Sequence, residues 1–232
     1  MELKFRSELI ESRSINEDSK ILKFSVPEDF NFKAGQHVRM AFYQDGKKIL
    51  RDYSIFSSPS EKGSISIYFK KVKGGYASSV LFDMKMGDKI EMKGPFGNFS
   101  IREDKEDIFM ISSGTGFGPF RSMILDLLSK HSEKKIILVR GYRNEESLCL
   151  GNELEELAQK NKNFMYYNVL SVPLNKDFEY TGHVQDFLDK LIPSNFNGNF
   201  YICGLKEMVL SVRSNLEERG ISKNKIFFER YD

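Results

Sequence analysis

The stretch that decides the fold is Asp107-Ile-Phe-Met-Ile-Ser-Ser-Gly114-Thr-Gly116-Phe-Gly-Pro119-Phe-Arg-Ser-Met-Ile-Leu-Asp-Leu-Leu128. Its apolar run, residues 108–111, predicts a buried strand of a parallel sheet. Glycines follow, and then Pro119, which suits the first turn of a helix because its missing N–H has no partner there. Apolar residues then recur at helical spacing as far as Leu128. The stretch therefore predicts a strand, a glycine-rich turn and a helix.

The glycine-rich turn also suggests a ligand. Backbone N–H groups at a helix start, together with the positive end of the helix dipole, favour a pyrophosphate. The sequence of this turn is not Gly-x-Gly-x-x-Gly, however, and a purely structural turn has the same composition. A nucleotide site and a plain connection both stay open until the rest of the chain is considered.

The composition excludes several classes of protein. The 232 residues carry a net charge of +2, which is too small to indicate a nucleic-acid-binding protein. Residues 1–100 hold 17 Lys and Arg against 13 Asp and Glu, an excess that weakly favours an acidic partner. No apolar run is long enough to span a membrane, and the N-terminus lacks a signal-peptide core, so we expect a cytoplasmic protein. The two cysteines, Cys149 and Cys203, make neither a disulfide framework nor a metal knuckle, and we expect no metal.

The first hundred residues predict β-structure. Short alternating or apolar runs are separated by turn signals such as Asp45-Gly46 and Lys62-Gly63. Several short strands at this spacing are typical of a closed antiparallel barrel. One helical patch near residues 76–81 follows Gly74-Gly75. The predicted strands cover residues 3–10, 21–26, 37–43, 51–56, 64–71 and 89–93.

After about residue 103 the pattern changes, and strands alternate with helices. This alternation predicts β-α-β units and a parallel sheet. The predicted strands cover residues 108–111, 135–139, 165–170, 199–203 and 225–229, and the helices cover 120–129, 152–159, 183–191 and 207–219. The charged segment 100–107 suits a linker. We therefore expect two domains, an N-terminal antiparallel β-barrel in residues 1–102 and a C-terminal α/β parallel-sheet domain, which binds the nucleotide, in residues 103–232.

Two motifs in the first half carry candidate chemistry. In Arg51-Asp-Tyr53-Ser54, the Arg and Tyr share one face of a strand. Arginine can clamp a phosphate and a tyrosine ring can stack on a flat heterocycle. Gly74-Gly75 and the small residues after them form a second anion-binding helix start. An exposed strand and a capped helix would have the same residues, so neither motif decides alone.

Taken together and in order, the motifs of the chain resemble those of the ferredoxin–NADP⁺ reductase superfamily. They are Arg-x-Tyr-Ser, Gly-Gly-x-x-Ser, Gly-Asp-x-Ile, Gly-Pro-Phe-Gly-x-Phe, Gly-Thr-Gly-x-x-Pro and Cys203-Gly204-Leu205. Each is weak, but the ordered set runs from about Leu3 to Tyr231. The resemblance implies a flavin-binding barrel followed by a nicotinamide-nucleotide domain, which is the architecture that the periodicity predicts.

The resemblance assigns FAD to the first half of the chain. Arg51 would contact the FAD pyrophosphate, Tyr53 would pack against the isoalloxazine, and Ser54 would hydrogen-bond near flavin N5. The helix start would present backbone N–H groups to the FAD phosphates. The residues of that start are Gly75, Tyr76, Ala77 and Ser78.

The resemblance assigns the nicotinamide nucleotide to the second half. The pocket would be shaped by Gly114, Thr115, Gly116 and Pro119. Cys203, followed by Gly204, ends a predicted strand, and ligands gather at the carboxyl ends of parallel strands. Cys203 would lie beside the nicotinamide, although a free cysteine is also common as a small buried side chain.

The C-terminus is similar to the Glu-x-Tyr ending of plant-type members. In that ending the tyrosine, here Tyr231, covers the flavin face that the nicotinamide must reach. Glu229 would tune the flavin or relay a proton, and Asp232 is one residue more than the ending has. Both residues are equally compatible with an ordinary terminal strand.

The sequence leaves the choice between NADH and NADPH open. Arg143 and Ser147 could bind the 2′-phosphate of NADPH, whereas Glu145 and Glu146 could hydrogen-bond a free ribose. Some bacterial relatives that use NADPH have an arginine after Leu-Val-Ser in the next strand, and residues 169–173 here read Val-Leu-Ser-Val-Pro. The missing arginine leans towards NADH.

We therefore expect an FAD-dependent oxidoreductase that moves a hydride from NADH or NADPH onto flavin N5, with Ser54, Cys203 and Glu229 as catalytic residues. Two cysteines cannot hold a four-cysteine iron–sulfur cluster, so the electrons would pass to a separate acceptor. The candidates are an acidic ferredoxin, a flavodoxin, an oxygenase component, a haem protein or a small molecule. The alternative is a non-catalytic or regulatory docking subunit that retains the reductase fold and takes up no FAD.

Overall fold

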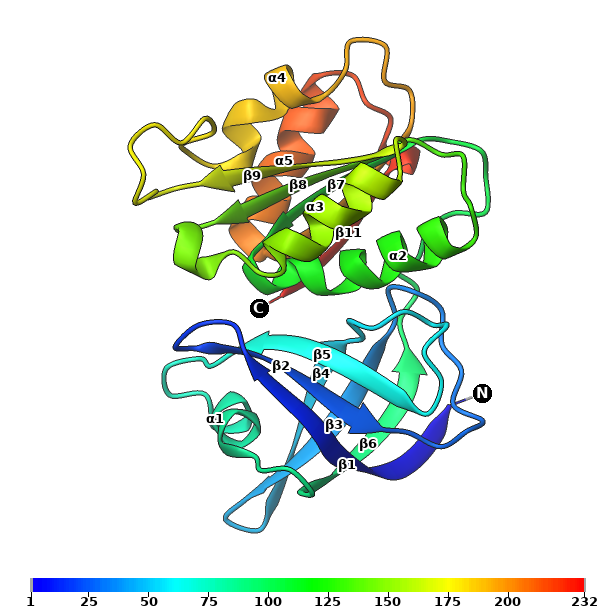
Figure 1. The fold of residues 1–232 in the computed structure, drawn as a ribbon, viewed down its shortest axis with the longest axis vertical. Helices are drawn as coiled ribbons and strands as arrows, with labels where there is room; N and C mark the ends of the chain where they lie inside the picture. Colours follow the sequence, from blue (N-terminus) through cyan, green and yellow to red (C-terminus); the bar gives the residue numbers. More distant parts are fainter. Residues whose placement is uncertain (1, 232) are drawn as a thin grey trace. The chain divides into compact units, whose positions relative to one another are not determined.

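The computed structural model describes residues 2–231, which divide into two units, each with its own sheet (Figure 1). The first unit holds the chain up to Ile101 together with Gly118–Leu127, and the second holds Arg102–Phe117 and the chain from Leu128 onward. Within the described residues, no helix is long and apolar enough to cross a membrane. The two-domain prediction, an antiparallel barrel followed by an α/β parallel-sheet domain, is confirmed.

The first unit is built on an antiparallel sheet. Its strands are β1 (Leu3–Ser14), β2 (Ser19–Ser25), β3 (His37–Gln44), β4 (Lys47–Ser54), β5 (Ser64–Lys70) and β6 (Lys89–Phe96). Their order is β4-β3-β6-β1-β2-β5, and a bridge between Ile55 and Ile67 brings the two edges of the sheet together. The inward side chains form one apolar cluster that includes Leu22, Met40 and Ile65.

Several strands of this sheet are longer than the sequence predicts, among them β1, β4 and β6. β1 pairs with β6 in its first half and with β2 in its second half, so it continues past residue 10. β4 begins at Lys47, directly after Asp45 and Gly46, whose φ values are 50° and 74°. Positive φ at both central residues of a two-residue loop is typical of a tight hairpin. The start of β4 is exposed, so it lacks the buried alternation that marks a strand in a sequence.

Helical residues complete the first unit. The helix α1 (Tyr76–Asp83) packs Ala77 and Leu81 into the barrel core. Residues Gly118–Leu127 come from the helix α2 (Phe117–Ser129). In that segment Ser122 Oγ donates a hydrogen bond to the Ser57 carbonyl at 2.7 Å. This part of the helix is therefore held by the barrel.

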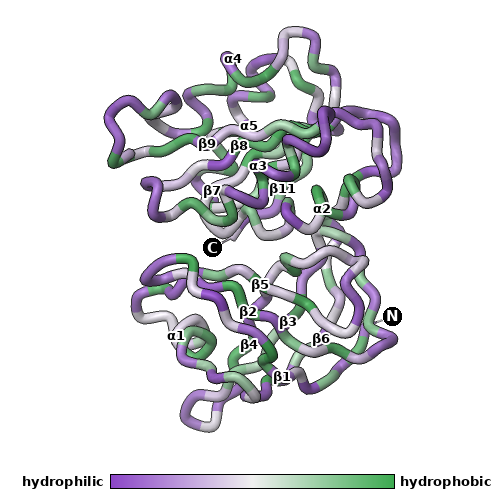
Figure 2. The backbone as a smooth tube through the Cα atoms, viewed as in Figure 1, coloured by the Kyte–Doolittle hydropathy of each residue, from purple (hydrophilic) through white to green (hydrophobic). Residues whose placement is uncertain are grey.

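The second unit is built on a parallel sheet. Its strands are β7 (Ile108–Ser113), β8 (Ile136–Tyr142), β9 (Phe164–Leu170), β10 (Asn199–Leu205) and β11 (Ile226–Tyr231), in the order β11-β10-β7-β8-β9. Figure 2 shows apolar residues concentrated on the central strands β7 and β8, as expected for strands buried on both faces. The helix α5 (Lys206–Glu218) lies on one face of the sheet and α3 (Gly151–Lys160) lies on the other (Figure 1).

One predicted helix, residues 183–191, is only partly α-helical. Residues 183–191 form a 3₁₀ segment, Val184–Phe187, followed by the short helix α4 (Leu188–Leu191). The apolar residues of this segment are nevertheless buried, because Val184, Leu188 and Leu191 all belong to the core of the second unit. The other predicted helices and strands are present, with ends that differ by a few residues.

Candidate flavin and nucleotide sites

Strand β4 carries the first predicted site residues, Arg51 and Tyr53. The register pairs them with Met40 and Val38 of β3, so the two side chains leave the strand on the same face. The Arg51 guanidinium is exposed, and its Nη1 donates a hydrogen bond to the Leu50 carbonyl at 2.8 Å. An exposed guanidinium is accessible to a phosphate. The contact between Arg51 and the FAD pyrophosphate remains a prediction.

Tyr53 is largely enclosed by the barrel. Its ring contacts Phe42 and Phe69 edge-on, with centroid separations of 6.5 and 6.3 Å. Burial raises the pKa of Tyr53 to about 12, and the nearby Arg51 charge opposes the shift. The ring is therefore neutral and fixed, which suits a stacking surface.

Ser54, at the end of β4, has polar neighbours that the sequence did not single out. The register places it opposite His37 on β3. Asp52 accepts two hydrogen bonds from Arg39, at 2.7 and 2.8 Å, and lies 3.6 Å from His37 Nε2. The bond from Arg39 lowers the pKa of Asp52, while burial lowers the pKa of His37. These residues could be found only with the strand register, since they lie on two different strands.

The predicted phosphate-binding helix start at α1 is partly used by the protein itself. The Gly75 N–H, which was predicted to face a phosphate, donates to the Val72 carbonyl at 2.9 Å. Ser78 Oγ accepts from Val72 N–H at 3.0 Å and donates to the Gly75 carbonyl at 3.1 Å. The backbone N–H groups of Tyr76, Ala77 and Ser78 remain, because the first turn of a helix offers them no internal partner.

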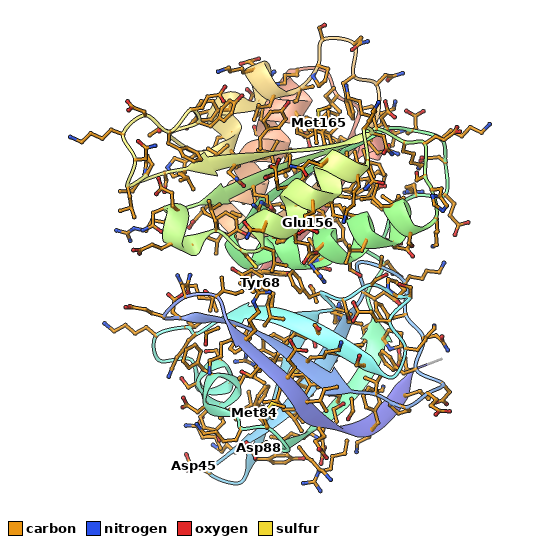
Figure 3. The ribbon with its side chains drawn as sticks, in the orientation of Figure 1. Asp45, Tyr68, Met84, Asp88, Glu156 and Met165 are labelled. Carbon is orange, nitrogen blue, oxygen red and sulfur yellow. The ribbon has the colours of Figure 1, made fainter. Side chains whose placement is uncertain are left out.

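A hollow of about 480 Å³ lies beside α1, at the side of the barrel marked by Met84 and Asp88 in Figure 3. The Tyr76 side chain lines this hollow, and the Tyr76 hydroxyl donates a hydrogen bond to the Tyr43 carbonyl. The Tyr76 side chain is thus engaged with the β3–β4 hairpin. Only the backbone of Tyr76 is then available for the predicted role.

The glycine-rich turn has the geometry that its sequence predicts. Gly114 has a φ of +51°, and residues Gly114–Gly116 form a 3₁₀ turn that leads into α2. Thr115 is half-buried, and Pro119 is the third residue of α2, where it forfeits no helical hydrogen bond. A Cβ on Gly116 would lie 2.2 Å from the Cys203 carbonyl oxygen. Only glycine therefore fits at that position.

The end of β10 packs against the same turn. Gly204 has a φ of +149°, and a Cβ there would lie 2.3 Å from Ser113 Oγ. Ser113 Oγ accepts a hydrogen bond from Leu205 N–H at 3.2 Å. The backbone of β10 thus packs directly against Gly116 and the Ser113 side chain.

One face of the parallel sheet changes from apolar to polar at its carboxyl edge. In register across the five strands lies an apolar and aromatic row made of Phe227, Tyr201, Met110, Leu138 and Tyr166. The next row on the same face, here called the polar row, consists of Glu229, Cys203, Ser112, Arg140 and Asn168. Ligands of open parallel sheets bind outside the carboxyl ends of the strands, so the polar row lies where a nucleotide is expected.

Cys203 sits inside the polar row with two C-terminal residues beside it. Its side chain is fully buried, and burial raises the pKa of the Cys203 thiol, with the Glu229 charge adding to the effect. A hydrogen bond with Tyr231 acts in the opposite direction. On the other side of Cys203, the buried hydroxyl of Ser112 has no hydrogen-bond partner in residues 2–231. The structure therefore brings Cys203, Glu229 and Tyr231 together, while Asp232 lies outside the described residues.

The segment after β8 holds the residues that bear on the choice of nucleotide. Glu145 does not offer its carboxylate to a ribose, because both oxygens accept backbone N–H groups, from Leu174 at 2.7 Å and from Asn175 at 3.0 Å. These bonds lower the pKa of Glu145. Arg143 is exposed, and Ser147 Oγ donates to Asn144 Oδ1 at 2.8 Å.

Two family models match the chain. An oxidoreductase FAD-binding domain matches residues 6–101, and an oxidoreductase NAD-binding domain matches residues 110–214. The chain is also 31% identical over 227 residues to NADH-cytochrome b5 reductase 1 of Dictyostelium discoideum, covering 95% of this chain and 79% of that protein. The chain belongs to the ferredoxin–NADP⁺ reductase superfamily.

Other members of the superfamily are similar over most of the chain. The reductase component of phenol 2-monooxygenase from Pseudomonas sp. (strain CF600) is 31% identical over 219 residues, but the match covers 91% of this chain and only 61% of that protein. A ferredoxin NADP⁺ reductase from Neisseria gonorrhoeae, solved with bound FAD and NADP, has the same fold, with a TM-score of 0.84, 23% identity and 98% of each chain covered. The Amycolatopsis cytochrome P450 reductase shares the fold with a TM-score of 0.90 and 24% identity, over 99% of this chain and 70% of that one.

The protein is thus an FAD-containing, NAD(P)H-dependent reductase with a flavin domain and a nicotinamide domain. Its residues fit both groups on structural grounds. In the flavin domain the first-turn N–H groups of α1 and the exposed Arg51 suit phosphates. In the nicotinamide domain the buried Ser112 hydroxyl is an unsatisfied polar atom at the carboxyl edge of the sheet. Residues 2–231 contain no group of His, Cys, Asp and Glu that could hold a metal ion.

Proposed function

We propose that this reductase oxidises NADH and delivers the electrons to a separate acceptor. FAD, when bound, supplies N5 as the hydride acceptor and can release the two electrons one at a time. Arg51 and the start of α1 bind the phosphates of FAD, Tyr53 supplies a fixed aromatic surface, and Ser54 supplies a hydroxyl for the flavin edge. The protein thus contributes binding and orientation, and the two cofactors contribute the chemistry.

The observation that carries the proposal is the polar row at the carboxyl edge of the second sheet. A hydroxyl on Ser112 without a hydrogen-bond partner in residues 2–231 and a thiol on Cys203 lie side by side on neighbouring strands, in the middle of the polar row. An unpaired buried hydroxyl costs about 1–3 kcal/mol, and a carboxamide such as that of nicotinamide offers the donor and acceptor that would satisfy it. The same edge holds the glycine turn, whose backbone suits a pyrophosphate.

Three residues of the second sheet would act on the nicotinamide. Cys203 stays a neutral thiol at ordinary pH, because burial raises its pKa, so it positions the ring rather than reacting with it. Glu229, half-buried on the neighbouring strand, holds a negative charge or a proton at the edge of the site. Tyr231 hydrogen-bonds to Cys203 and keeps the thiol oriented.

The preference for NADH rests on Glu145. Its carboxylate already occupies two successive backbone N–H groups, Leu174 and Asn175, which is the arrangement that a phosphate would use. A dianionic 2′-phosphate near this segment would meet a fixed negative charge. Arg143 and Ser147 are the residues that would bind the phosphate if NADPH were used, and the name of the Dictyostelium relative specifies NADH.

The proposed acceptor is a protein with an acidic surface, such as a ferredoxin, a flavodoxin or an oxygenase component. The excess of Lys and Arg in residues 1–100 favours such a partner. One similar protein is named as the reductase component of a phenol 2-monooxygenase. Two cysteines are too few for a four-cysteine iron–sulfur cluster within these 232 residues.

An electron count tests the proposal. FAD is added to the purified protein, the excess is removed, and NADH is added without oxygen, with ferricyanide as a one-electron acceptor. We expect a yellow protein that consumes about two ferricyanide ions for each NADH, because a hydride carries two electrons. A colourless protein that retains no FAD would overturn the proposal and favour the non-catalytic docking subunit.

A further inference from the structure

Arg140, in the polar row, is a fully buried arginine. Its guanidinium is held by neutral oxygens. Nε and Nη2 both donate to Asn168 Oδ1, at 3.1 and 2.8 Å, and Nη1 donates to the Cys149 carbonyl. The positive charge is thus hydrogen-bonded without a carboxylate among these partners.

Aromatic rings surround the same guanidinium. Its Cζ lies 4.9 Å from the ring centroid of Phe117, 5.5 Å from that of Tyr142 and 5.7 Å from that of Tyr166. Stacking of a planar guanidinium on aromatic faces is favourable, and lysine cannot reproduce it. The environment is therefore specific for arginine.

Burying a charge costs free energy, so we would expect an apolar residue at position 140 if the side chain only had to fill space. Replacing a buried ionic group by apolar residues of the same volume is often neutral or stabilising. The contacts of Arg140 suggest what the charge provides instead. A guanidinium has several donors in one fixed plane, so one side chain can fix several segments at once.

Arg140 joins three segments that leave the carboxyl ends of neighbouring strands. Phe117 directly follows the glycine turn after β7. Cys149 ends the segment after β8 that contains Arg143 and Ser147. Asn168 lies on β9, just before the strand end that leads to the segment paired with Glu145. All three segments border the proposed nucleotide site, whereas Arg140 itself has no exposed surface.

We infer that Arg140 is a positioning residue for the adenosine half of the nucleotide. It holds the glycine turn and the segment after β8 at a fixed separation, so that both are preformed before the nucleotide binds. It makes no contact with the reacting atoms. The inference rests on the proposed function, because it takes the carboxyl edge of the second sheet as the nucleotide site.

Two pairs of variants test the inference. Arg140→Met removes all the donors, and Arg140→Lys retains the charge without the planar fork. Asn168→Leu removes the acceptor on β9, and Asn168→Asp retains acceptor oxygens. The matched control is Arg213→Met on α5, where the guanidinium lies 4.2 Å from the Phe228 ring centroid and Nη2 donates to Glu217 at 3.2 Å.

Binding and turnover are measured separately. Calorimetry gives the Kd of ADP-ribose, which lacks the nicotinamide and needs no FAD. Stopped-flow absorbance gives the flavin reduction rate against NADH concentration. For Arg140→Met, Arg140→Lys and Asn168→Leu we expect the Kd of ADP-ribose and the half-saturating concentration of NADH to rise about tenfold. The flavin reduction rate at saturating NADH should stay within about twofold of the parent. Asn168→Asp should recover most of the affinity, and Arg213→Met should match the parent.

Other outcomes would overturn either the inference about Arg140 or the proposed function. Unchanged ADP-ribose affinity in both Arg140→Lys and Asn168→Leu overturns the inference, even if Arg140→Met fails to fold. An equal loss of affinity in Arg213→Met overturns it too, because general destabilisation would then explain the result. If the parent binds ADP-ribose but NADH does not reduce its flavin, the proposed function fails while the Arg140 variants still test the inference. A parent that binds no ADP-ribose overturns both.

Discussion

The two units present their ligand residues in opposite ways. In the barrel, the main candidate is the exposed side chain of Arg51, which contributes little to packing. In the parallel sheet, the candidates are glycines in backbone contact and a row of buried and half-buried side chains in register. A site made of exposed side chains can lose its ligand and keep its fold. A site made of packed backbone cannot change without affecting stability, and this difference sets the order of the predictions.

The largest effect is expected at Gly116. Gly116→Ala would place a Cβ 2.2 Å from the Cys203 carbonyl oxygen, so the turn or β10 must shift. We expect a loss of about 3 kcal/mol in the free energy of unfolding, measured by denaturant titration. Gly118→Ala is the matched control, because its Cβ would lie 3.9 Å from Ser54 Cβ, an ordinary contact. Equal stability of the two variants would contradict the described turn.

Arg51→Ala should show the opposite behaviour. Loss of a charge-assisted hydrogen bond to the FAD pyrophosphate should weaken FAD binding by about 1.5–3 kcal/mol, with little change in the unfolding of the apoprotein. Equilibrium dialysis against FAD measures the first quantity. Lys48→Ala is the control on the same strand, where an exposed ion pair with Glu91 at 3.0 Å is lost instead. FAD retained as tightly by Arg51→Ala as by the parent would remove Arg51 from the site.

An intermediate effect, on the rate of flavin reduction, is expected at Cys203. Cys203→Ala should slow flavin reduction at saturating NADH by about tenfold while FAD stays bound, because the side chain is proposed to position the nicotinamide. Burial raises the pKa of the thiol, so Cys203 stays protonated as pH rises through neutrality and contributes no titration to the rate. Rapid-mixing absorbance measures the rate. An unchanged rate would make Cys203 a packing residue only.

The smallest effect concerns nucleotide choice. Glu145→Gln removes a negative charge that two backbone N–H groups hold in place. The ratio of kcat/KM for NADPH to that for NADH should rise only severalfold, because solvent screens a charge at the surface. Glu156→Gln on α3, which loses only an exposed pair with Lys160, should leave the ratio unchanged. If the parent strongly prefers NADPH, Arg143 and Ser147 become the residues to test.

Much of the fold could be predicted from the sequence, since alternation and helical spacing are local patterns. The turn from Gly114 to Pro119 could be predicted because glycine permits backbone angles that other residues rarely adopt, while proline fixes φ at a value that suits the first turn of a helix. The start of β4 was missed because its exposed residues leave no periodic signal. The boundary between residues 102 and 103 stays a prediction.

The candidate site was less accessible to sequence reasoning than the fold. The polar row depends on the register of five strands, and register is set by long-range pairing that a sequence does not display. In the sequence, Arg140 looks like an ordinary charged residue near a strand end. Nothing local indicates that it will be buried and will donate hydrogen bonds to Asn168 and to the Cys149 carbonyl. The same limit applies to Glu145, whose partners Leu174 and Asn175 lie in another loop.

The most direct test of the central claim is rapid mixing of the FAD-loaded protein with NADH and, separately, with NADPH, without oxygen. The flavin absorbance reports hydride transfer in a single turnover, independently of any acceptor. We predict that the absorbance is bleached by both nucleotides, and that NADH gives the larger ratio of rate to half-saturating concentration. Flavin that stays oxidised with both nucleotides would contradict the assignment of this protein as an NAD(P)H-dependent reductase.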